Sequence, residues 1–224
     1  CCGALLAVHW VLFYGSIKAA NVSVGVVCFA LNGFFTALLE PMASGKRFSL
    51  RDLLLGLITL GGIVLIFGLN MQFRTGIVIG TLSSLFYTLF AIASKRVQSA
   101  TGVESSAMLL YELLTGWCVL SLAMPFYAML YPSVSLMPEG SDWLFITLFA
   151  SVFTIGPFLT QLQALRTLSA FTVNLSYNLE PLYSIALAML LFNEAQELNL
   201  SFWMGVSMIV AAVGYHAMCR KDGE

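Results

Sequence analysis

Charge is scarce in this chain of 224 residues. Asp, Glu, Lys and Arg together make up only 9% of it, whereas about a quarter of a soluble globular domain is charged. Hydrophobic residues make up 59%, which excludes both a disordered chain and an ordinary soluble domain. The net charge of −1 gives no excess of positive charge that would attract nucleic acid. The composition predicts an all-α integral membrane protein.

Residues that hold metals or carry out catalysis are also few. The two histidines, His9 and His216, lie far apart, and the five cysteines form neither a CxxC pair nor a Cys/His cluster. A membrane enzyme would need a nucleophile with a base, or a metal cluster, and we find neither pattern. We therefore expect no enzyme, no catalytic residue, no metal site and no cofactor.

Long runs without any charged residue are the main positive feature of the sequence. A helix that crosses a bilayer needs about 20 mostly apolar residues. Seven runs have no charge, and an eighth, Thr167–Asn193, holds only Glu180. We read these as eight transmembrane helices; the seven runs without charge are Cys1–Ile17, Ala19–Leu39, Leu53–Phe73, Thr75–Ser94, Leu113–Pro138, Trp143–Leu165 and Leu198–Cys219.

Basic residues gather on alternate connections between these spans. One side of the membrane has only Lys18 and Arg74, together with four acidic residues. Positive charge marks the cytoplasmic side, so both termini of the multi-pass chain are predicted to be cytoplasmic. The other side collects Lys46, Arg47, Arg51, Lys95, Arg96, Arg166, Arg220 and Lys221.

The chain resembles itself at an offset of 148 residues. This offset places Lys18 on Arg166, Thr36 on Ser184, and Asn32-Gly33 on Glu180-Pro181. One connection then carries Lys46 and Arg47 in the first copy and Glu194 and Glu197 in the second. Opposite charge at equivalent positions indicates opposite orientation, which is an inverted-topology repeat typical of secondary transporters. The second copy starts near Thr75 and has five spans, whereas the first copy has only three. We therefore expect two further helices, or about 70 residues, before the first copy.

Several stretches resemble the EamA branch of the drug/metabolite transporter superfamily. They are His9-Trp10, Ser16-Ile17-Lys18, Asn21-Val22-Ser23-Val24, Phe35-Thr36-Ala37-Leu38-Leu39-Glu40-Pro41, and Ser176-Tyr177-Asn178-Leu179-Glu180-Pro181-Leu182-Tyr183. The resemblance implies ten helices in two inverted five-helix repeats around a central cavity. Residues 1–70 would be the last three helices of the first repeat, 75–219 the complete second repeat, and 220–224 a cytoplasmic tail. It also implies the cell membrane, which in a bacterium is the inner membrane.

Glu180 lies near the middle of a span, where a charged side chain costs about 2.5–3.5 kcal/mol. On the same helix Asn174, Tyr177 and Asn178 share a polar face with Pro181 and Ser184. Such a face must meet protein or water. Paired Gly or Pro interruptions in two halves point to a transporter's binding site, and Asn32-Gly33 is the partner of Glu180-Pro181. The alternative is that Glu180 and Asn178 only form hydrogen bonds between helices.

Other polar or aromatic residues complete the candidate site. Gln161 and Gln163 follow Gly156-Pro157, and one glutamine should face the cavity. His9 could couple protons or simply form a hydrogen bond. In the fourth span, Gly76, Gly80 and Ser84 follow a spacing of four that is typical of helix packing. The predicted substrate-binding residues are His9, Trp10, Asn32, Tyr87, Gln161, Asn174, Tyr177, Asn178 and Glu180.

Two further acidic residues have roles of other kinds. Glu112 could bind, gate, or pair with Lys95 or Arg96, and Glu40 next to Pro41 is interpreted as structural.

The function predicted from these features is transport. We expect a secondary transporter, an exporter or exchanger, that moves small metabolites across the cytoplasmic membrane by alternating access. Its expected partners are a small-molecule substrate and the lipid bilayer, with no nucleic acid; a homodimer stays open. A non-transporting membrane scaffold or truncated pseudo-transporter is the alternative.

Overall fold

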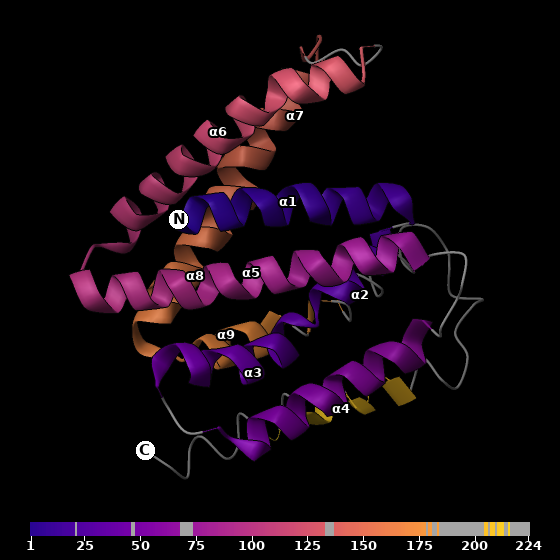
Figure 1. Cartoon of the computed structure of the whole chain (residues 1–224), viewed down its shortest axis with the longest axis vertical. Helices are drawn as coiled ribbons and strands as arrows, with labels where there is room; N and C mark the ends of the chain where they lie inside the picture. The colour runs from indigo at the N-terminus through magenta and orange to yellow at the C-terminus, as the bar shows by residue number, and fades with distance from the viewer. Residues whose placement is uncertain are drawn as a thin grey trace.

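Helices make up most of the part of the chain that can be described in the computed structural model (Figure 1). The description covers 1–20, 22–45, 48–67, 74–132, 137–177, 179–180, 183, 204–205, 207–208, 210–212 and 215. No strand occurs within these residues. Asn178, Pro181, Ser184, both glutamates of the second acidic connection and the C-terminal tail lie outside them.

Two long helices, α1 (Cys2–Ala19) and α5 (Arg74–Thr101), run side by side through the middle of the molecule (Figure 1). Glycine allows this close approach. A Cβ atom added at Gly76 would lie 2.4 Å from the Cβ of Ala20, and one at Gly80 would lie 2.7 Å from the Ser16 hydroxyl oxygen. The packing role predicted for the four-residue spacing in this helix is confirmed.

The second predicted span is broken in two. Helix α2 (Val22–Phe29) ends before Ala30 and Leu31, and α3 (Asn32–Ser44) starts directly after them. Hydroxyl groups of the neighbouring helix α5 satisfy carbonyls on both sides of the break, because Ser84 donates to the Phe29 carbonyl (3.1 Å) and Thr88 to that of Asn32 (3.3 Å). The sequence showed a poor helix former here, but one continuous helix was expected.

The fifth and sixth spans extend away from this centre as α6 (Ser105–Leu130) and the continuous segment α7 (Asp142–Leu148), η2 (Phe149–Ile155) and α8 (Gly156–Thr167) (Figure 1). Helix α6 starts earlier than the charge-free run predicted. The segment η2 is a π-helix, in which the Thr154 hydroxyl donates to the carbonyl five residues back, that of Phe149 (3.1 Å). It directly precedes Pro157, which has no N–H for the backbone ladder. The outer parts of these helices expose large apolar side chains, as a bilayer requires.

The remaining helices are α4 (Leu50–Phe67) and α9 (Ala170–Tyr177). Helix α9 packs on α3, and Ala37, Leu55, Phe171, Leu175 and Ala212 form a small core there. A larger core joins α1, α5, α6, α8 and α9. The contact between α3 and α9 therefore connects the first 70 residues to the later part of the chain.

Four of the described helical segments are long and apolar enough to cross a membrane: Cys2–Ala19, Arg74–Thr101, Ser105–Leu130 and Asp142–Thr167. The eight spans and the inverted repeat stay predictions. A cavity of about 640 Å³ has Gly45, Lys95 and Arg96 in its wall, so the C-terminal ends of α3 and α5 lie close together. Lys46 and Arg47, which follow α3, lie outside the described residues, and the grouping of basic connections on one side stays a prediction.

Candidate functional site

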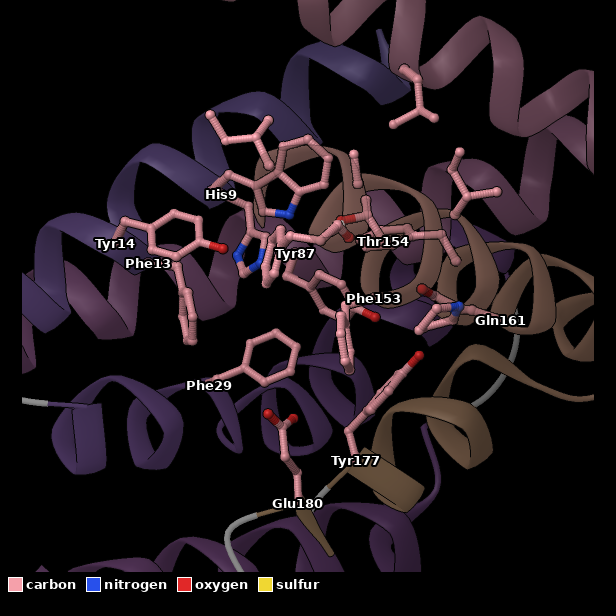
Figure 2. A pocket seen from close by; sticks show the side chains of 18 of the residues that line it. His9, Phe13, Tyr14, Phe29, Tyr87, Phe153, Thr154, Gln161, Tyr177 and Glu180 are labelled. Carbon is pink, nitrogen blue, oxygen red and sulfur yellow. Dashed lines mark hydrogen bonds between the residues drawn. The ribbon is translucent and has the colours of Figure 1, made fainter. Parts of the chain in front are cut away.

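A cavity of about 960 Å³ lies between α1, α2, α5, α6, α7, η2 and α8, with Tyr177 and Glu180 completing its wall (Figure 2). Its size suits a small organic molecule, because ligand pockets usually measure about 300–1,000 Å³. The lining residues are His9, Trp10, Phe13, Tyr14, Phe29, Tyr87, Leu113, Phe145, Ile146, Leu148, Phe149, Ala150, Phe153, Thr154, Ile155, Pro157, Phe158, Gln161, Tyr177 and Glu180.

Six of the nine predicted site residues line this cavity, although they come from four parts of the chain. They are His9, Trp10, Tyr87, Gln161, Tyr177 and Glu180. Gln161 is buried and lines the cavity, whereas Gln163 is exposed, as expected for two glutamines on opposite sides of one helix. The structure thus brings these six side chains together around one cavity.

His9 is fixed by α5. Its Nδ1 lies 3.0 Å from the Ser83 carbonyl, which can only accept a hydrogen bond, so Nδ1 donates to it. The Ser83 hydroxyl in turn donates to the His9 carbonyl (3.1 Å). The imidazole is 4% exposed and contacts the rings of Phe13, Phe29 and Tyr87, with centroids 5.0–5.9 Å apart. The hydrogen bond that the sequence offered as one role for His9 is present, and proton coupling stays a prediction.

Three aromatic rings form one corner of the cavity. Phe29 and Tyr87 have centroids 4.7 Å apart, and Tyr177 lies 6.0 Å from Tyr87 and 6.1 Å from Phe29. The planes meet at 57–83°, so the ring faces point in different directions. We call this group the aromatic triad. On another part of the wall, Trp10 meets Phe158 edge to face at 5.7 Å.

Among the described residues of the cavity wall, Glu180 has the only charged side chain. It is partly buried and follows Tyr177 by three residues. Figure 2 shows its carboxylate directed into the cavity, toward Phe29 of the aromatic triad. The polar side-chain groups elsewhere in the described wall are uncharged hydroxyls, the Gln161 amide, the Trp10 indole N–H and the His9 ring.

Two predicted site residues lie outside the cavity. Asn174 donates from Nδ2 to the Thr36 hydroxyl (2.7 Å), and Thr36 donates to the Asn32 carbonyl (2.6 Å). Both asparagines are fully buried where α3 meets α9. Asn174 thus joins α9 to α3, and the Asn32 amide has no hydrogen-bond partner among the residues that the structure describes. Asn178 lies outside the described residues.

Sequence reasoning missed most of the aromatic wall. Phe13, Tyr14, Phe29 and Phe158 were not singled out, nor were three phenylalanines of α7 and η2. Aromatic residues in a membrane span look the same in sequence whether they face lipid or a cavity. A signal was nevertheless present, because Phe145, Phe149 and Phe153 follow one another at intervals of four, as Trp10 and Tyr14 do.

Charged side chains hold the loop between α8 and α9. The Glu40 carboxylate accepts hydrogen bonds from the backbone N–H groups of Phe171 (2.8 Å) and Ala170 (3.3 Å). Lys95 donates to the carbonyls of Leu165 and Leu168. An acid thus meets the start of one helix and a base meets the end of the other, where each is favourable. Glu40 has the structural role predicted for it.

Glu112 is 2% exposed on α6, and the hydroxyl of Ser94 donates to its carboxylate. It lies outside the cavity wall, which does not favour the binding role that the sequence left open. Among the described residues no group of three or more His, Cys, Asp or Glu side chains could hold a metal ion.

Comparison with known proteins gives a family for most of the chain. A model described as the EamA-like transporter family matches residues 74–215. A search of curated proteins finds no match. One similar solved structure, described only as a crystal structure of a protein, has a TM-score of 0.69 and 18% sequence identity, and the match covers 95% of this chain and 74% of that one. At this identity the likeness concerns the fold alone.

Proposed function

Because this chain belongs to the EamA-like transporter family, we propose that it is a secondary transporter whose small-molecule substrate binds in the 960 Å³ cavity. The observation that carries the proposal is the origin of the cavity wall. Trp10 and Phe29 come from the first 70 residues, whereas Tyr87, Gln161 and Tyr177 come from the later part. A site built from both parts can change its access when one part moves against the other.

The contact between α3 and α9 supports alternating access. It lies beyond the cavity, toward the end of the molecule that holds Gly45 and Lys95. The Thr36–Asn174 hydrogen bond and the Glu40 contact to α9 join the two parts there. If the basic connections are cytoplasmic, this arrangement is the state closed to the cytoplasm, and opening to that side would require both contacts to separate.

Transport into proteoliposomes tests the proposal. The purified full chain would be reconstituted and given labelled amino acids, nucleosides, sugars, organic acids and organic cations. We expect uptake of at least one compound above that of protein-free vesicles. The Gln161→Ala substitution should reduce this uptake by about 5- to 30-fold, because a polar contact worth roughly 1–2 kcal/mol is lost.

Gln163→Ala is the matched control, because this exposed glutamine lies two residues further along the same helix. It should leave uptake unchanged. Uptake that survives Gln161→Ala in full would contradict the assignment of the cavity. No uptake of any compound would favour the alternative of a non-transporting membrane scaffold.

A further inference from the structure

The balance of charge and aromatic surface in the cavity narrows the substrate class, and this inference rests on the proposed function. Ten aromatic side chains stand in the wall, together with one carboxyl group, that of Glu180. Neither Lys nor Arg occurs among the described residues that line it. We propose that the cavity binds an organic cation with an aromatic or other apolar body and without an anionic group.

Glu180 has the only charged side chain among the described residues of the cavity wall. A carboxylate at membrane depth costs free energy unless an opposite charge or hydrogen bonds compensate it. No described residue of the wall offers a positive side chain, and the carboxylate is directed into the cavity beside the aromatic triad (Figure 2). A cationic ligand would supply the missing opposite charge, whereas an anionic ligand would meet repulsion with nothing to balance it.

The aromatic rings of the wall provide a second attraction for a cation. A cation is attracted to an aromatic face within about 6 Å of the ring centroid, and more strongly where water is excluded. The planes of Phe29, Tyr87 and Tyr177 are inclined to one another by 57–83°, so their faces point in several directions from which a cation can be attracted. The remaining wall, which includes Trp10 and Phe158, offers apolar surface to the rest of the molecule.

Both features are needed for this conclusion. A carboxyl group alone would suit any cation, including a metal ion, but Glu180 has the only carboxylate among the described residues of the wall, whereas hard cations take about six or more oxygen ligands. Aromatic rings alone would suit neutral apolar compounds equally well. Together they favour quaternary or alkylated ammonium compounds over sugars, nucleotides and organic acids.

The proposed class of ligand is tested by measuring the binding of three matched probes to the full chain in lipid nanodiscs. The probes are benzyltrimethylammonium, its uncharged carbon isostere neopentylbenzene, and the anion phenylacetate, measured by calorimetry against empty nanodiscs. We expect the cation to bind at least tenfold more tightly than either of the others. This comparison needs no substitution, so it holds even if a variant fails to fold.

Two substitutions test whether the cation binds beside Glu180 and the aromatic triad. Glu180→Gln should weaken binding of the cation at least tenfold, and Phe29→Leu should weaken it about three- to tenfold. Glu104→Gln, which removes an exposed acid outside the cavity, should change nothing. The proposed cationic class would be overturned if phenylacetate or neopentylbenzene bound as tightly as the cation. It would also be overturned if the Glu180→Gln protein bound the cation with unchanged affinity.

The failure of this inference can be separated from failure of the proposed function. If none of the probes binds but another compound is transported and Gln161→Ala blocks its transport, the cavity remains the site and the cationic class is wrong. If the probes do not bind and no compound is transported, both proposals are overturned.

Discussion

Glu40 is the residue that joins the two parts of the chain most directly. Its carboxylate bonds two backbone N–H groups at the start of α9 while its own helix belongs to the first 70 residues. A charged acceptor forms hydrogen bonds about twice as strong as a neutral one, and negative charge is favourable at a helix N-terminus. The charge of Glu40, rather than its size, should therefore hold this contact.

Glu40→Gln keeps the shape of the side chain and removes its charge. We expect the amides of Ala170 and Phe171 to exchange with deuterium about 5- to 30-fold faster, corresponding to a loss of roughly 1–2 kcal/mol. Hydrogen-exchange mass spectrometry of the protein in nanodiscs measures this. Glu104→Gln serves as the control, and equal exchange in both variants would show that the Glu40 charge is not what protects the start of α9.

At the scale of helices, the seam between α1 and α5 depends on Gly80. A Cβ atom there would lie 2.7 Å from the Ser16 hydroxyl oxygen on α1 and 2.6 Å from the Cβ of Cys28 on α2, so α5 would have to move away from both helices. Gly156 has open space in the same direction, with nothing within 4 Å. These two glycines form a natural pair for comparison.

We expect Gly80→Ala to lower the free energy of unfolding by about 1–3 kcal/mol, as overpacking of a core usually does. Gly156→Ala should not be destabilising, because it meets no neighbour and alanine is the better helix former. Thermal unfolding in one detergent compares the two variants. A Gly80→Ala protein as stable as the Gly156→Ala protein would mean that this seam can relax at little cost.

The sequence predicted helices better than it predicted their interruptions. Charge-free runs located α1, α4 and α5 closely, because a bilayer imposes both length and apolar composition. The break at Ala30 and Leu31 was not predicted as such, because it depends on hydroxyl groups of α5 that donate to carbonyls on both sides of it. The π-helix before Pro157 was not predicted either, because it depends on the backbone hydrogen bonds of a whole turn.

The candidate site could be predicted in part for a related reason. Polar residues are rare in membrane spans, so Gln161, Tyr177 and Glu180 stood out by type alone. The phenylalanines of the wall did not, because lipid-facing and cavity-facing rings have the same composition. Asn174 has the same polar character as the lining residues, and only the position of Thr36 on α3 shows that it joins helices.

For the whole molecule, orientation in the membrane is the property to test. Gly102 and Ser141 lie near opposite ends of α6, and neither is buried. In a cysteine-free background, we expect Gly102→Cys to react with a membrane-impermeant maleimide only from the cytoplasmic side and Ser141→Cys only from the other side. Labelling in intact cells and in inverted vesicles measures this. The reverse pattern would invert the predicted topology.

The widened turn of η2 sets how the chain tolerates changes in its length. Hydrogen bonds in a π-helix join residues five apart instead of four, so each such turn holds one more residue than a turn of α-helix. A protein lacking one residue between Phe149 and Ile155 could continue α7 into α8 as ordinary α-helix, with the flanking faces near their present orientation. The same deletion within α5 would rotate all later side chains by about 100°. Single-residue gaps between related sequences are therefore expected in this stretch and not in the central helix.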